Sequence, residues 1–310
     1  MPPSPPSPET DEPAAFLGID VGGTNIKSVL LAQAGGAVTV LDHAECRTTG
    51  SAPEEILDQI AAIARDRCAS APVPMRLGFC LPGAIDRDAG VAGVMPNLPG
   101  IWHGVSVRDR VQQSAGLPTS VVNDARAFSL AESQLGAGRG LGTVVGVTLG
   151  TGLGGGVVIG GKLHEGASGF AGELGHQIVQ IDGELCGCGN RGCAETFVKT
   201  TRLLEATGLG SVKAVFEHAA AGQPSAVAAV ESYVSHLAVA LANVHTLLCP
   251  DAFVIGGGIA AAGPRLLDPL LERIRALITF DRPSSVQVRP AELGPIAGAI
   301  GAALVAARDR

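Results

Sequence analysis

Three short glycine-rich segments each follow directly after a run of apolar residues. They are Asp20-Val-Gly-Gly-Thr24, Thr148-Leu-Gly-Thr-Gly152 and Gly256-Gly-Gly258. Short apolar runs bounded by glycine are typical of β-strands. Because glycine has no side chain, backbone amide groups at such turns can point at an anion. The sequence therefore predicts strand ends that are shaped to hold phosphate groups.

The residues beside these turns indicate which kind of phosphate-binding site each turn could form. Asp20 closes the first apolar run, where a carboxylate could hold Mg²⁺ through water, although the same segment could be a plain hairpin turn. In the second segment Gly150, Gly152 and Gly155 match the spacing of a dinucleotide-binding loop. That loop must lead into a helix, whereas residues 157–159 read as a strand. A dehydrogenase is therefore the lesser interpretation.

The order of expected elements predicts an α/β protein with two lobes. Strands are expected first as a meander and then in alternation with helices, and this order restarts near residue 119. Such a pattern favours two mixed sheets. The expected strands cover 16–20, 26–31, 37–47, 75–81, 119–124, 143–149, 156–163, 252–255 and 286–291. The expected helices cover 53–70, 125–138, 199–207, 211–221, 225–248, 265–278 and 295–308.

Composition and charge limit the partners of the chain. With 22 basic and 29 acidic residues the net charge is −7, and no basic run is present. A nucleic-acid partner is therefore not expected, because binding to a phosphate backbone depends on clustered Lys and Arg. The proline-rich start lacks the regions of a signal peptide, so we expect residues 1–15 to form a disordered tail and the protein to be cytoplasmic, without a membrane partner.

Three of the seven cysteines lie close together in the sequence and indicate a metal-binding site. Cys186, Cys188 and Cys193 follow His176 within one short, glycine-rich stretch. Three thiolates and one imidazole form the donor set of a closed tetrahedral zinc site, which implies a structural rather than a catalytic ion. The other four cysteines lie in apolar surroundings and read as buried thiols.

Asn123 and Asp124 stand where an expected strand passes into an expected helix. Either residue could simply cap the helix, since Asn and Asp are favoured there. A carboxylate at a strand end could also serve as a general base. From these residues alone both interpretations stay open.

The glycine turns and the cysteine cluster together resemble a known family. The turns are similar to the two phosphate motifs and the adenosine motif of the actin–hexokinase–Hsp70 ATPase fold. The stretch 173–195, with Glu173-Leu-Gly-His176 and Cys193-Ala-Glu195, resembles the ROK family (repressors, open reading frames and sugar kinases). The resemblance runs from about residue 16 to the C-terminus.

This resemblance implies a two-lobed, ribonuclease H-like (actin-like ATPase) fold with mixed sheets and a ligand cleft between the lobes. Residues 16–122 with 296–310 would form the smaller N-terminal lobe, and 123–295 the larger C-terminal lobe with the zinc-binding loop. The cofactors implied are ATP, Mg²⁺ and a structural Zn²⁺, and a homodimer is expected.

The resemblance also assigns roles to residues. Asp124 would be the catalytic base, and His176 would bind both zinc and sugar. The sugar would be held by Asn97, Asn123, Asp124, Glu173, His176 and Glu195. The nucleotide and its Mg²⁺ would be held by Asp20, Gly22, Gly23, Thr24, Thr148, Gly150, Thr151, Gly152, Gly256, Gly257 and Gly258. The zinc ligands would be His176, Cys186, Cys188 and Cys193.

The activity implied is transfer of a phosphoryl group from ATP to the 6-hydroxyl of a hexose, with glucose as the first choice. Kinases of N-acetylglucosamine, N-acetylmannosamine, fructose, mannose or allose are alternatives within the family. Residues 196–200, Thr-Phe-Val-Lys-Thr, depart from the Ala-Ser-Gly runs of many ROK glucokinases, which weakens the choice of glucose. A sugar-sensing regulator is a further alternative, but we expect no DNA-binding domain because only a short tail precedes the first strand.

Overall fold

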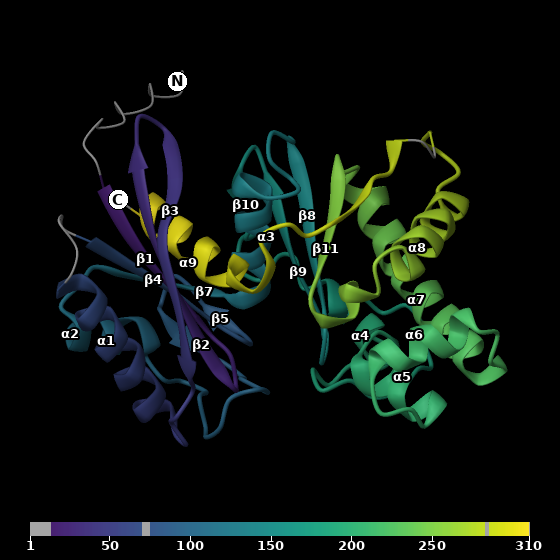
Figure 1. The fold of residues 1–310 in the computed structure, drawn as a ribbon, viewed down its shortest axis with the longest axis horizontal. Helices are drawn as coiled ribbons and strands as arrows, with labels where there is room; N and C mark the ends of the chain where they lie inside the picture. The colour runs from purple at the N-terminus through teal and green to yellow at the C-terminus, as the bar shows by residue number, and fades with distance from the viewer. Residues whose placement is uncertain (1–13, 70–74, 283–284, 310) are drawn as a thin grey trace. The chain divides into compact units, whose positions relative to one another are not determined.

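The computed structural model describes residues 14–69, 75–282 and 285–309, and these fall into two compact units (Figure 1). The first unit runs to Val122 and resumes at Ala302, and the second comprises Asn123–Gly301. The division at Ala302 lies inside the last helix, whereas we expected it at residue 296. Of the expected tail, residues 1–13 lie outside the described residues, while Ala14 and Ala15 already belong to the first strand.

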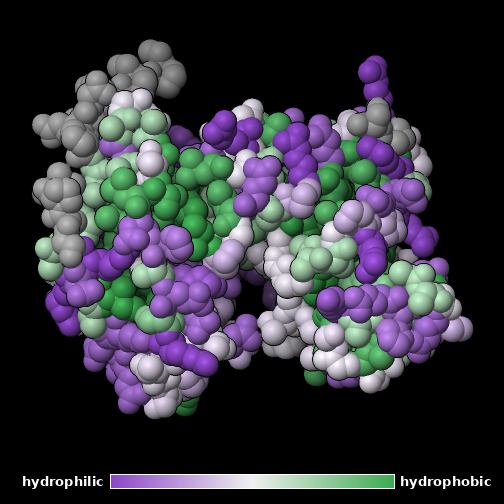
Figure 2. All heavy atoms as spheres, viewed as in Figure 1, coloured by the Kyte–Doolittle hydropathy of each residue, from purple (hydrophilic) through white to green (hydrophobic). Residues whose placement is uncertain are grey.

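The first unit contains a mixed sheet of five strands in the order β3-β2-β1-β4-β7. β1 pairs antiparallel with β2 and parallel with β4, and β2 pairs antiparallel with β3. The strands are β1 (Ala14–Val21), β2 (Asn25–Ala34), β3 (Ala37–Arg47), β4 (Met75–Leu81) and β7 (Thr119–Asn123). β3 is an edge strand and is largely exposed, and Figure 2 shows hydrophobic residues at the surface in its region.

Two helices pack on one face of this sheet, α1 (Pro53–Ala69) and α2 (Val107–Ala115) (Figure 1). α1 starts at Pro53. Proline is tolerated there because the backbone N–H that it lacks would have no partner inside the first turn of a helix. Glu55 accepts hydrogen bonds from the backbone and the hydroxyl of Ser51 just before the helix. Ile56 and Ile60 place its apolar side in the core.

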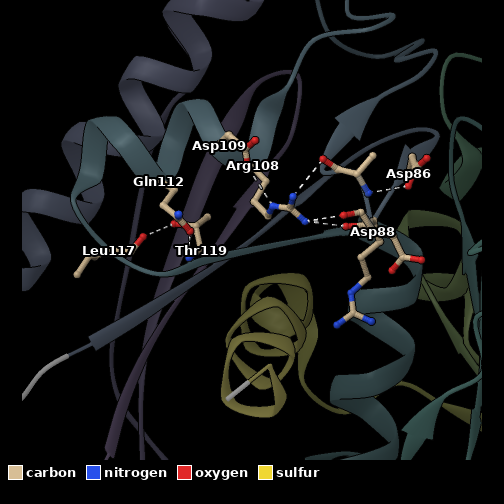
Figure 3. A network of polar contacts seen from close by, with 9 residues as sticks. Asp86, Asp88, Arg108, Asp109, Gln112, Leu117 and Thr119 are labelled. Atoms are coloured by element: carbon tan, nitrogen blue, oxygen red, sulfur yellow. Dashed lines mark hydrogen bonds and ion pairs between the residues drawn. The ribbon is translucent and has the colours of Figure 1, made fainter.

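The sequence did not predict α2, nor the short hairpin of β5 (Ile85–Asp86) and β6 (Val91–Ala92). α2 buries only Val107 and Val111, so its apolar stripe is too short to show periodicity. Figure 3 shows what fixes the helix: the Arg108 guanidinium donates to the carbonyls of residues 87, 88 and 89 in the β5–β6 turn. The contact of Arg108 with the β5–β6 turn thus stabilises a helix whose sequence alone shows little helical periodicity.

The second unit repeats the same arrangement of strands. Its sheet has the order β10-β9-β8-β11-β12, in which β8 pairs antiparallel with β9 and parallel with β11. The strands are β8 (Thr143–Leu149), β9 (Leu153–Ile159), β10 (Lys162–Leu163), β11 (Ala252–Gly256) and β12 (Val288–Pro290). The first two glycine turns therefore occupy equivalent positions, since each joins the central strand of a sheet to its antiparallel neighbour. Mixed sheets in both units confirm the expected fold class.

Helices cover both faces of this second sheet. α3 (Asp124–Leu135) packs on β8 and β9, and α7 (Pro224–Leu248) and α8 (Pro264–Leu277) lie on the other side (Figure 1). The remaining helical segments are η1 (Leu174–His176), α4 (Ala194–Phe197), α5 (Thr200–Thr207), α6 (Val212–Ala220), η2 (Gly258–Ala262), η4 (Gly294–Ile296) and α9 (Ala297–Arg308).

α7 is long and apolar enough to cross a membrane by length and composition. Its buried residues nevertheless include Tyr233, Leu237 and Leu241, which belong to the hydrophobic core of the second unit. The helix therefore serves as the central core helix of this unit.

We expect Gly78→Ala to destabilise the first unit strongly. Gly78 lies in β4, and a methyl group there would collide with the carbonyl of Ala302 in α9, which is backbone and cannot rotate away. Overpacking of this kind costs about 1–3 kcal/mol. Chemical denaturation should show that loss of unfolding free energy, whereas Gly210→Ala, where a methyl group meets nothing within 4 Å, should leave it nearly unchanged.

Candidate functional site

The first glycine turn joins β1 to β2 in the first unit. Asp20 lies at the end of β1 and accepts a hydrogen bond of 3.3 Å from the Cys80 thiol on β4. Burial raises the pKa of the Asp20 carboxyl, while the bond from Cys80 and the charge of Lys27 oppose that rise. A carboxylate held in this way would gain from a nearby cation, which is consistent with the predicted Mg²⁺ site.

The two glycines of this turn are required by close packing. Gly22 donates to the Asn25 carbonyl at 3.0 Å, which closes the turn. A side chain at Gly23 would lie 2.5 Å from the carbonyl oxygen of Asn97. The structure thus brings the predicted sugar residue Asn97 against the predicted phosphate turn. Thr24 follows directly and is exposed.

The second glycine turn joins β8 to β9. Its carbonyl at Gly150 accepts from both the backbone and the hydroxyl of Thr200, at 2.9 and 2.8 Å. Thr200 was not predicted from the sequence as a site residue, although it belongs to the segment 196–200, which differs from the Ala-Ser-Gly runs noted above. Thr200 thereby fixes the turn that contains Gly150, Thr151 and Gly152.

The third glycine segment lies beside the second. Thr148 at the end of β8 is paired in parallel register with Gly256 at the end of β11. Gly257 has φ 89° and ψ 173°, a conformation that is essentially restricted to glycine. Any side chain on Gly257 would also collide with the Leu149 backbone. The predicted phosphate and adenosine motifs therefore meet at one edge of the sheet.

Asn123 and Asp124 form the start of α3, and their contacts separate the two roles left open by the sequence. The side chain of Asn123 caps the helix by accepting from the Arg126 backbone at 3.1 Å. Asp124 is the first helical residue, and its Oδ1 accepts from Asn123 Nδ2 at 3.0 Å and from the Ala125 backbone at 2.8 Å. Asn123 is the cap, so Asp124 is not needed for that purpose.

A buried arginine orients Glu173. Arg126 has a side chain only 4% exposed, and its guanidinium bonds Glu173 Oε1 at 2.9 Å, while the Glu173 side chain is 44% exposed. Arg126 also donates to the Ala171 carbonyl. Arg126 is not among the residues predicted from the sequence. The available signal was a cation two residues after the candidate base Asp124, on a helix that is otherwise apolar at that end.

Glu195 is held in a comparable way at the start of α4. Its Oε2 accepts from the Leu153 backbone at 3.1 Å, just beyond the second glycine turn. A side chain at Gly152 would collide with this carboxylate. The structure therefore places the predicted sugar residue Glu195 next to the predicted phosphate turn, in the same unit.

His176, Cys186, Cys188 and Cys193 converge on one point. All four ligand atoms lie within 4.8 Å of one another, with 3.7 Å between Cys186 Sγ and His176 Nδ1 and 3.6 Å between Cys188 Sγ and Cys193 Sγ. Zn–S bonds of about 2.3 Å and Zn–N bonds of about 2.0–2.1 Å would separate tetrahedral ligands by about 3.5–3.8 Å. These residues fit a zinc ion.

The loop around the cluster shows why glycine is needed. Gly189 and Gly192 have φ of 93° and 71°, while Gly187 has no positive φ. Burial raises the pKa of Cys186 and takes that of Cys193 to about 12, whereas a backbone hydrogen bond from Asn190 lowers that of Cys188. A divalent cation would supply the charge that two buried thiolates need.

The expectation that the other four cysteines are buried is only partly correct. Cys80 is buried, but Cys46 and Cys249 are exposed and Cys68 is intermediate. Cys46 lies on the edge strand β3, where neither face is covered, and Cys249 caps the end of α7. An apolar sequence neighbourhood does not guarantee burial at an edge or a helix end.

Comparison with known families agrees with this geometry. The sequence profile of the ROK family matches residues 16–309, which is almost the whole chain. The chain belongs to the ROK family.

Known sugar kinases resemble the chain along nearly their full length. The glucokinase of Thermotoga maritima is 32% identical over 94% of this chain and 96% of its own length. The crystal structure of the ROK hexokinase from Thermus thermophilus superposes with a TM-score of 0.85 at 31% identity, covering 95% of this chain and 98% of that one. A ROK glucokinase from Streptomyces griseus, solved with glucose and AMPPNP, gives 0.79 at 34% identity, with 95% and 100% covered.

We expect Gly257→Ala to damage both stability and nucleotide binding in this ROK protein. Backbone strain of about 1–3 kcal/mol at the glycine-only conformation would add to the collision with Leu149. Thermal unfolding should occur at a lower temperature, and calorimetry should give weaker binding of an ATP analogue. Gly210→Ala is the control, because a methyl group there meets nothing within 4 Å and the residue lies outside the three glycine segments. Equal behaviour of the two variants would contradict the assigned packing.

Proposed function

We propose that this ROK protein is an ATP-dependent glucose kinase that transfers the γ-phosphate to the 6-hydroxyl. The observation that carries the proposal is full-length similarity to glucokinases, including one solved with glucose and AMPPNP. The two glycine turns at equivalent strand ends supply independent support, because such turns present backbone amides to phosphates.

Asp124 is the proposed general base. It would take the proton from the attacking sugar hydroxyl, and its Oδ1 is already held by Asn123 and the Ala125 backbone. Phosphoryl transfer demands mainly positioning and charge neutralisation, so a fixed carboxylate meets the requirement.

The proposed nucleotide site is built from the three glycine segments. Asp20 would hold Mg²⁺ through its water shell, and Gly22, Gly23 and Thr24 would contact phosphate in the first unit. In the second unit the phosphates would meet Thr148, Gly150, Thr151 and Gly152, and the adenosine would meet Gly256, Gly257 and Gly258. Close backbone packing at Gly23 and Gly257 is consistent with these roles.

The proposed sugar contacts are Asn97, Asn123, Asp124, Glu173, His176 and Glu195. Two of these are positioned by other parts of the protein: Arg126 orients Glu173, and the Leu153 backbone orients Glu195. Polar groups fixed before the ligand arrives discriminate between polyols, because each buried group left unpaired costs about 1–3 kcal/mol.

The unusual segment 196–200 does not oppose glucose. Thr196 and Phe197 are buried, and Phe197 stacks on His236 with ring centroids 4.1 Å apart. Thr200 bonds the glycine turn. Packing and support of the turn therefore explain why this segment differs from the Ala-Ser-Gly runs of many glucokinases, and glucose remains the proposed substrate.

Zinc, quaternary structure and location complete the proposal. The four-residue Cys/His cluster would hold a structural Zn²⁺ that stiffens the loop from residue 176 to 193. We further propose a homodimer in the cytoplasm, as the family resemblance implies.

Asp124→Asn is the direct test of the proposed base. The amide oxygen can still accept from the Ala125 backbone, so the fold should persist, but the side chain can no longer take a proton. We expect the turnover number for glucose to fall by about 10²–10⁴. Steady-state kinetics, with the exposed substitution Asp109→Asn as control, would measure this. Turnover near that of the unmodified protein would refute the assignment.

Loss of zinc should weaken sugar binding more than nucleotide binding. His176 has two ring nitrogens, and a metal on Nδ1 would fix the direction in which Nε2 points. We expect Cys188→Ala to lower both thermal stability and glucose affinity, while affinity for an ATP analogue changes little. Metal content by mass spectrometry and two calorimetric titrations test this, with Cys46→Ala as control. Normal glucose affinity in a zinc-free variant would count against the coupling.

A further inference from the structure

Three side chains outside the proposed kinase site meet at the C-terminal end of α7. They are His245 in its last turn, Cys249 at its cap and Asp281 in the segment after α8. Asp281 Oδ2 lies 3.0 Å from His245 Nε2 and 3.6 Å from Cys249 Sγ. The third separation, between the sulfur and Nε2, is 3.9 Å.

These separations match one face of a tetrahedral zinc site. Zinc bonds of about 2.3 Å to sulfur and about 2.0–2.2 Å to nitrogen and oxygen place such ligands about 3.4–3.6 Å apart. Each observed separation is therefore within about 0.4 Å of the tetrahedral value. In the Cys/His cluster at residues 176–193, the separations of 3.7 and 3.6 Å lie within about 0.2 Å of the tetrahedral values.

The backbone at Cys249 supports a role for its thiol. Among the described residues, Cys249 is the one non-glycine residue with a positive φ, at 42°. It occupies the left-handed position after a helix that glycine usually fills, so the fold tolerates strain there. The i, i+4 relation brings this thiol back beside His245, because residues four apart share a helix face.

The other two donors are also held in place. Asp281 Oδ2 accepts from the Ser285 hydroxyl at 2.7 Å, and Oδ1 accepts from the Arg282 backbone at 2.6 Å. The His245 side chain is only 1% exposed. Within the described chain its Nδ1 has no hydrogen-bond partner, so the polar contacts of this buried ring are all on the Nε2 side.

We propose that His245, Cys249 and Asp281 form a second zinc site, separate from the Cys/His cluster. A thiolate, an imidazole and a carboxylate are all ligands that Zn²⁺ prefers. Cys249 is exposed and Asp281 is partly exposed, so the ion can enter from solvent and water can complete its coordination. The ion joins the end of the core helix α7 to the segment that leads into β12, and it acts as a structural clamp.

Zinc stoichiometry of the full-length protein tests this site. We would load the unmodified chain, Cys249→Gly and Cys249→Ser with excess Zn²⁺, remove free metal by gel filtration, and measure zinc per chain by mass spectrometry. Glycine suits the left-handed backbone, so the Cys249→Gly variant removes the ligand without harming the fold. Cys46→Ser, at an exposed cysteine outside both clusters, is the matched control.

We expect both Cys249 variants to hold one zinc ion fewer per chain than the unmodified protein and Cys46→Ser. With Co²⁺ as the probe, the thiolate-to-metal absorption should fall only in the Cys249 variants. Added Zn²⁺ should raise the unfolding temperature less in Cys249→Gly than in the unmodified protein. Equal zinc content in all four proteins would overturn the proposal and leave a metal-free His–Asp contact. Combining Cys249→Gly with Cys188→Ser should remove two ions, which separates the two sites.

Discussion

The pairing of parallel strands β8 and β11 is the constraint on which the second unit depends. Its register places Thr148 opposite Gly256, so that the strand ends and their glycine turns finish at the same edge of the sheet. The turns can then pack backbone against backbone, as Gly257 does on Leu149. A side chain at Gly257 would collide with the Leu149 backbone, so this close approach requires glycine.

In the second unit, residues proposed to bind the substrates are held in place by other groups of the protein. Arg126 directs Glu173, Thr200 fixes the turn at Gly150, and the Leu153 backbone holds Glu195. Such supports matter in a phosphotransferase because small errors of position reduce the rate of a reaction that depends on alignment. In the segment 196–200, Phe197 packs against His236 and Thr200 supports the second glycine turn.

The two cysteine-containing clusters differ in the way the chain assembles them. In the first, three of the donors come from eight consecutive residues, and glycines with positive φ let one loop turn its thiols inward. In the second, two donors come from the end of a long helix and the third from a segment more than thirty residues away. The ligands of the first cluster can be recognised in the sequence by their spacing within one loop. The ligands of the second cluster come from two distant segments and have no such spacing.

That difference separates what the sequence determined from what the tertiary structure decided. The sequence by itself determined the strands β3, β4 and β8 to the residue, the three glycine turns and the donor set of the Cys/His cluster, because each depends on neighbouring residues and their local conformation. Only the tertiary structure decided that α2 forms, that Arg126 meets Glu173 and that Asp281 meets His245 and Cys249. These contacts arise when distant segments pack together, and no periodicity or spacing in the chain records them.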